Sequence, residues 1–97
     1  MRMMLKAIMD TEAGNEAIRN GSMSQVVDHL VKGLSAEAAY FFPEDGHRTA
    51  LVVFDLADPS QIPALTEPLF SSGRARVTLT PCMNLDDLQK GLGQVQI

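Results

Sequence analysis

The apolar run over residues 48–56 is the feature that most constrains the fold of this chain. Successive side chains of a β-strand point to opposite faces of its sheet. One face of this predicted strand carries Ala50, Val52 and Phe54, and the other carries Leu51 and Val53. Both faces are apolar, so both must be covered. A chain of 97 residues has helices enough for one face only. We therefore expect a second copy of the chain to cover the other face.

Composition indicates one folded domain over residues 1–97. Hydrophobic residues make up 45% of the chain, which is typical of a globular protein. A chain of this length buries only about 60–70% of its unfolded surface, so oligomerisation would add stability. The formal net charge of −4 argues against nucleic acid as a partner, because phosphate binding needs a basic surface.

The sequence also predicts a cytoplasmic location. Arg2 and Lys6 interrupt the apolar N-terminal residues, and no small-residue cleavage site follows, so we expect no signal peptide. No apolar run approaches the ~20 residues of a membrane span. The one cysteine, Cys82, cannot form an internal disulfide, which fits a reducing compartment.

Periodicity and turn residues predict the order β-α-β-β-α-β followed by a short helix. Strands are expected at 1–9, 37–43, 48–56 and 74–81, and helices at 22–34, 58–73 and 84–92. Residues 10–21 are expected to be a polar connection, in which residues 12–19 could form a short helical turn. The Asp45-Gly46 pair predicts a tight hairpin. This α+β order is the ferredoxin-like pattern, an antiparallel sheet with both main helices on one face. The first and third strands would be central.

Three segments resemble small dimeric α/β-barrel proteins, particularly muconolactone isomerase-like members and uncharacterised bacterial relatives. They are the run from Phe54 to Ser60 (FDLADPS), the segment Glu67-Pro68-Leu69-Phe70 and a strand ending in Thr80-Pro81. The resemblance implies a homodimer of facing sheets, with a cleft between each sheet and its helices or loops. The superfamily includes isomerases, cofactor-free monooxygenases, haem-handling enzymes and ligand-binding modules, so the fold does not select a function. The chain has no Trp, which the Asn–Trp–His set of haem-degrading monooxygenases needs, and we expect no cofactor.

Basic and hydroxyl side chains gather on the outward faces of the first and last strands. This candidate ligand-binding surface comprises Arg2, Lys6, Arg74, Arg76 and Thr78. The two strands are neighbours in the ferredoxin-like order, so the surface could hold a small anion, with Arg forming a bidentate pair with a carboxylate. The alternative is structural: edge charges that prevent aggregation, or dimer salt bridges to Asp10 and Asp55.

Candidate acid–base residues are His29, Tyr40 and His47. His47 lies beside Glu44 at the hairpin, and because imidazole is a common general base in proteins, His47 could act as one. His29 lies on the first main helix, where it could face the cleft. The alternatives are a solvated turn histidine and a packed helix-surface histidine.

We expect no metal site, because the two histidines lack a carboxylate at ligand spacing. Cys82 would need a cationic or helix N-terminal setting to act as a thiolate, and its alternative role is that of a small hydrophobic residue. The N-terminal methionines alternate at strand period, which indicates core or dimer packing.

Two functions remain open. The first is a homodimeric module that binds a small anionic or aromatic metabolite or has a structural role. The second is a cofactor-free isomerase or monooxygenase acting on a small aromatic or lactone metabolite, with His29, Tyr40, Arg76 and His47 as its polar groups. If at least two of these side chains point into one apolar pocket, the enzyme function is favoured over the binding module.

Overall fold

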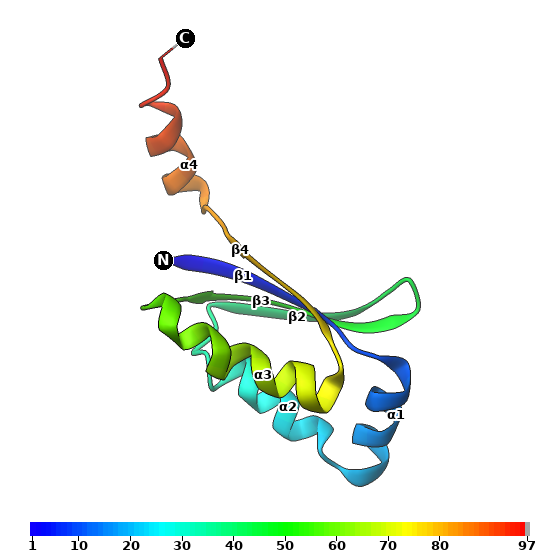
Figure 1. Cartoon of the computed structure of the whole chain (residues 1–97). Helices are drawn as coiled ribbons and strands as arrows, with labels where there is room; N and C mark the ends of the chain where they lie inside the picture. Colours follow the sequence, from blue (N-terminus) through cyan, green and yellow to red (C-terminus); the bar gives the residue numbers. More distant parts are fainter. Residues whose placement is uncertain (97) are drawn as a thin grey trace.

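A computed structural model, which describes residues 1–96, has a four-stranded antiparallel sheet with helices packed on one face (Figure 1). The chain is therefore an α+β protein. Its elements are β1 (Arg2–Ile8), α1 (Thr11–Asn20), α2 (Met23–Val31), β2 (Ala38–Glu44), β3 (His47–Asp55), a 3₁₀ turn (Pro59–Gln61), α3 (Ile62–Gly73), β4 (Arg76–Pro81) and α4 (Leu85–Leu92). No helix among these residues is both long and apolar enough to cross a bilayer.

The strand order is β2-β3-β1-β4, which places β1 and β3 in the centre of the sheet. Leu5 on β1 is paired with Val52 on β3 and with Leu79 on β4. Leu5 and Val52 have no exposed surface. Because these three side chains lie in one row across the sheet, that row forms the centre of the hydrophobic core.

The β2–β3 hairpin turns at Asp45 and Gly46, as the sequence predicted. Their φ angles are 51° and 78°, and both lie in the left-handed region. A two-residue hairpin turn with positive φ at both positions matches the right-handed twist of the flanking strands. The turn fixes the pairing of Glu44 with His47, and so the register of the whole hairpin.

The segment after β1 differs from the expected polar connection, because it forms the helix α1. The Asp10 side chain accepts a hydrogen bond from the Ala13 amide and caps the helix N-terminus. Gly14, which reads as a loop residue in the sequence, is buried in this helix. A Cβ atom at this position would lie 2.7 Å from Nη1 of Arg48. Glycine therefore permits close packing of α1 against β3.

The second main helix begins and ends where the sequence predicted, with a 3₁₀ turn at its start and Gly73 as its last residue. Asp58 and Gln61 form a capping box around the 3₁₀ turn, which leads directly into α3. Pro68 lies inside α3, which continues through it to Gly73, and Leu69 beside it is buried on the core side. Arg74 caps the helix in the left-handed region, with φ 44°. Arg74 therefore lies outside β4, which begins at Arg76 rather than at Arg74.

The two faces of the sheet differ in their cover. α2 and α3 lie against the face that carries Leu5 and Val52 (Figure 1). On the opposite face, which we call the open face, the side chains of β1 and those of Leu51 and Val53 on β3 are only half-buried. The large apolar members of the open face are Met4, Ile8, Tyr40, Phe42, Leu51 and Val53. The alternation predicted for residues 48–56 is therefore confirmed, and its second apolar face has no covering layer within residues 1–96.

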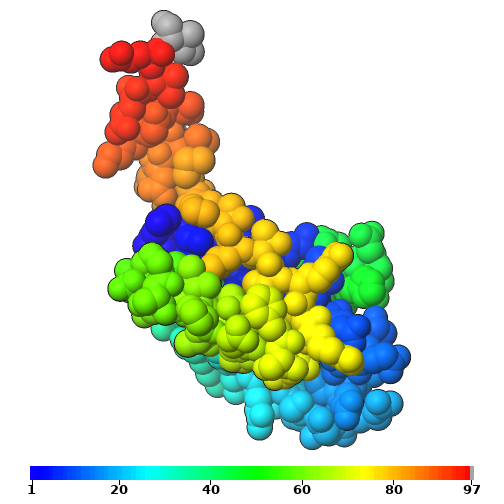
Figure 2. All heavy atoms as spheres, in the orientation of Figure 1, coloured from blue at the N-terminus to red at the C-terminus, as the bar shows by residue number. Residues whose placement is uncertain are grey.

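The last helix, α4, stands away from the rest of the molecule (Figures 1 and 2). None of its residues is buried. The described chain measures 54 × 29 × 17 Å and has a radius of gyration of 15.3 Å, whereas a compact domain of this length has about 12.5 Å. The protein is elongated because α4 makes almost no contact with its own sheet.

Candidate functional site

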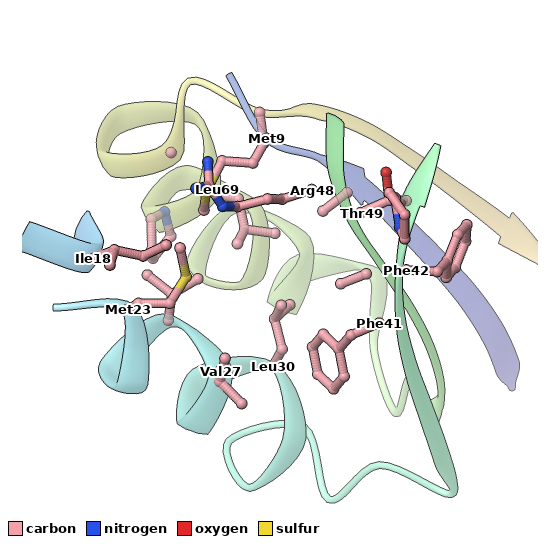
Figure 3. A pocket seen from close by; sticks show the side chains of 17 residues that line it. Met9, Ile18, Met23, Val27, Leu30, Phe41, Phe42, Arg48, Thr49 and Leu69 are labelled. Carbon is pink, nitrogen blue, oxygen red and sulfur yellow. The ribbon is translucent and has the colours of Figure 1, made fainter. Parts of the chain in front are cut away.

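A cavity of about 480 Å³ lies between the sheet and the helices, near the hairpin end of β3 (Figure 3). Its lining comes from α1, α2, α3 and the strands β1, β2 and β3. Prominent lining residues are Ile18, Val27, Leu30, Phe41, Ala50 and Leu69. Ile18 and Phe41 are about half exposed, at 54% and 52%, so apolar side chains also form part of its rim.

Arg48 is the charged side chain of this cavity. Its Nη2 donates a hydrogen bond of 3.1 Å to Oδ1 of Asn15 on α1. No carboxylate within residues 1–96 lies at ion-pair distance from its guanidinium. Thr49 also lines the cavity, but its hydroxyl donates to the His47 carbonyl at 3.1 Å. The guanidinium of Arg48 therefore keeps donors available at the edge of an apolar space.

The position of Arg48 follows from strand parity and helix packing. Arg48 has the same parity as Ala50 and Val52, so it belongs to the helix-facing side of β3. Its side chain extends toward Leu69 in Figure 3. Gly14 leaves the room in which the guanidinium sits, because any larger residue there would meet Nη1. Arg48, Asn15 and Gly14 were not among the site residues predicted from the sequence, although the parity of Arg48 with Ala50 already placed it on the helix-facing side.

Most of the basic residues predicted to bind a ligand are already paired within the chain. Arg2 donates from Nε to Glu37 at 2.9 Å and from Nη1 to Asp87 at 2.8 Å. Its hydrogen bond to Glu37 raises the pKa of the guanidinium above the ordinary value. Lys6 forms an ion pair with Glu44. The carboxylates therefore neutralise much of the positive charge expected on this surface.

The rest of the predicted surface divides into two places. Arg74 pairs with Asp10 at 3.1 Å, at the junction of α3 and α1. Arg76 and Thr78 are exposed on β4, on the open face beside β1. Asp55, the other expected dimer partner, lies 2.7 Å from the N-terminal amino group of its own chain. Arg76 thus remains as an unpaired cation of the open face within the described residues.

The candidate acid–base residues do not converge. His29 lies between α2 and α3, with its Nε2 3.1 Å from the Leu65 carbonyl oxygen. Tyr40 is 64% exposed on the edge strand β2. His47 lies at the hairpin, with Nδ1 3.3 Å from the Thr11 hydroxyl. None of the three lines the cavity that contains Arg48.

Other reactive groups are isolated. Cys82 is half-buried after β4, and its backbone amide donates to the Arg2 carbonyl at 3.1 Å. Within residues 1–96, no three His, Cys, Asp or Glu side chains gather closely enough to hold a metal ion. The cavity with Arg48 is therefore the strongest candidate site in the described part of the chain.

No protein-family model matches this chain, and no curated protein matches it.

Proposed function

We propose that this protein is a homodimeric module of the ferredoxin-like, dimeric α/β-barrel type that binds a small hydrophobic anion in the cavity between sheet and helices. The observation that carries the proposal is the guanidinium of Arg48, which has no carboxylate partner within residues 1–96 and lies at the edge of an apolar cavity.

The size and lining of the cavity support a ligand of this class. Pockets for small molecules usually enclose about 300–1,000 Å³ and combine apolar walls with a few polar groups, and this one encloses about 480 Å³. Apolar walls favour an aromatic or aliphatic body. A guanidinium at the edge favours a planar carboxylate, which it can hold through two parallel hydrogen bonds. An aromatic carboxylate satisfies both requirements.

The sheet supports the assignment to this type of fold. Its strand order is β2-β3-β1-β4, and both crossover connections contain helices on the same face. The open face carries the half-buried Leu51 and Val53. Apolar surface of this kind favours association, and a second sheet of the same shape would cover it.

The enzyme alternative, a cofactor-free isomerase or monooxygenase, has weaker support. A general base must lie within hydrogen-bond reach of the proton that it removes. His29, Tyr40 and His47 occupy three separate places, and Arg76 lies on the open face. A ligand in the cavity would meet the guanidinium of Arg48, which would bind and orient a carboxylate.

Isothermal titration with 1-naphthoate tests the proposal, and the neutral 1-naphthamide reports the contribution of the anionic charge. We expect naphthoate to bind more tightly than naphthamide. Arg48→Gln should weaken naphthoate binding roughly tenfold, about 1.4 kcal/mol, and should barely change naphthamide binding. Arg76→Gln, which removes the same charge from the open face, is the matched control.

The affinities of the two variants show whether the ligand lies in the cavity or on the open face. Loss of affinity with Arg48→Gln and not with Arg76→Gln supports the cavity. The opposite result would place the ligand on the surface of Arg2, Lys6, Arg76 and Thr78. Absence of binding by both compounds would contradict the proposed function.

A further inference from the structure

The helix α4 presents an apolar stripe that its own chain does not cover. Leu85, Leu88 and Leu92 are 66%, 40% and 60% exposed. Their spacing of three and four residues places them on one side of the helix. The polar residues Asp86 and Lys90 lie on other sides. The helix is therefore amphipathic, with its apolar side free within the described chain.

A helix of this length needs a surface to pack on. Isolated helices shorter than about 12–15 residues are marginal in water, and α4 has eight residues. Asn84 and Asp87 form a capping box that stabilises its first turn. Gly91, inside the helix, weakens it. Since no residue of α4 is buried, the stabilisation by packing has to come from another surface.

The ion pair between Arg2 and Asp87 holds α4 on the side of the open face. Arg2 has the same parity on β1 as Met4 and Lys6, so its side chain belongs to the open face. Its guanidinium holds Asp87 in the first turn of α4 at 2.8 Å. In Figures 1 and 2, α4 accordingly projects away from α2 and α3. A partner seated on the open face would lie beside this helix.

The size of the open face also argues for a contribution from α4. Four strands about 4.8 Å apart, with seven residues at about 3.3 Å each, give a projected area of roughly 440 Å². A stable interface usually buries about 800 Å² on each partner. The leucine stripe enlarges the apolar surface on the same side of the molecule. A second copy can cover both parts at once, because a two-fold interface uses the same surface of each copy.

We propose that α4 is an arm that packs through Leu85, Leu88 and Leu92 onto the second copy of the chain. This inference rests on the proposed homodimer and adds the arm to the open face as part of its interface. A bilayer surface fits less well, because Asp86 and Asp87 on the polar sides of the helix would be repelled by anionic lipids.

Sedimentation equilibrium of the full chain with Leu88→Glu tests the arm. Lys90→Gln is the control, since it changes the net charge equally but lies opposite the stripe. We expect Leu88→Glu to raise the dimer dissociation constant at least tenfold, whereas Lys90→Gln should leave it within about twofold. Because α4 has no buried residue, circular dichroism and the fold of the sheet should survive both changes.

Hydrogen exchange gives a second test on the unmodified chain. Amides of α4 should exchange faster on dilution below the dissociation constant. Two outcomes would contradict the role of the arm and leave the homodimer intact. In the first, Leu88→Glu does not change the dimer dissociation constant. In the second, the α4 amides exchange at the same rate at all protein concentrations. An unmodified chain that stays monomeric would overturn both. Binding of the unmodified chain to phosphatidylglycerol vesicles that Leu88→Glu abolishes, with dimerisation unchanged, would assign the stripe to a membrane instead.

Discussion

Nη1 of Arg2 on β1 lies 2.8 Å from a carboxylate oxygen of Asp87 in the first turn of α4. Nε of the same guanidinium donates to Glu37, just before β2, at 2.9 Å. One side chain thus links a central strand to the edge of the sheet and to the projecting helix. Few other contacts fix the direction of α4, so Arg2 is the principal attachment of the arm.

Loss of this attachment should loosen α4 without unfolding the protein. Arg2→Gln should speed hydrogen exchange of the α4 amides a few-fold, because it removes the ion pair to Asp87. The thermal midpoint should stay nearly unchanged, since exposed ion pairs contribute little to global stability. Arg76→Gln is the control, because it removes an equal charge that has no carboxylate partner within residues 1–96. Equal exchange in the two variants would argue against this role of Arg2.

Charges placed on the two faces of β3 should have different consequences. Val52 has no exposed surface, so Val52→Asp buries an unpaired carboxylate and should prevent folding. Leu51 is half-buried on the open face, so Leu51→Asp should leave the fold intact and produce a monomer. Circular dichroism reports the fold, and sedimentation reports the assembly. A Leu51→Asp protein that remains dimeric would exclude the open face as the interface.

Gly14 provides a way to move Arg48 without replacing it. A methyl group at position 14 would lie 2.7 Å from Nη1 of Arg48 and must displace this flexible side chain. Alanine also favours the helix by about 1 kcal/mol, which offsets the crowding, so stability should change by no more than about that amount. Gly14→Ala should therefore weaken 1-naphthoate binding several-fold in a titration and leave 1-naphthamide binding unchanged. Unaltered naphthoate affinity would mean that the position of Arg48 does not matter for the anion.

The hairpin turn depends on the conformational freedom of Gly46. Its φ of 78° disfavours any side chain, so Gly46→Ala should destabilise the protein by about 1 kcal/mol. In calorimetry this corresponds to a fall in the thermal midpoint of roughly 4–8 °C. Gly91→Ala is the matched control, because that glycine is helical and a Cβ atom there would meet nothing within 4 Å outside its own helix. The thermal midpoint of this variant should not fall. Equal midpoints for the two variants would contradict the strain assigned to the turn.

The strands and the hairpin could be predicted because their signals are local. Alternation along β3 gave its two apolar faces, and the Asp45-Gly46 pair gave the turn. The helix α1 could not be recognised in the same way, because Gly14 and Asn15 favour loops. In the structure both residues lie next to Arg48. Gly14 leaves space for its guanidinium, and Asn15 accepts a hydrogen bond from it. Such a contact between positions 33 residues apart is tertiary and has no local signature.

The candidate site was harder to predict for a related reason. Arg2, Lys6 and Arg74 were predicted to bind an anion because of their positive charge. Each has a carboxylate partner that only the folded chain brings near. Arg48 was not among the predicted site residues, although its parity with Ala50 placed it on the helix-facing side. The α4 helix was expected from its leucines and its cap. Its projection from the sheet depends on Arg2 and could not be read from the sequence.

Native mass spectrometry of the unmodified chain tests the central claim, a homodimer formed through the open face, most directly. The chain mass is 10.5 kDa, and we expect a species of twice that mass. Addition of 1-naphthoate should shift this species by one ligand for each copy. A monomer at every concentration would contradict the homodimer and remove the partner on which the arm depends.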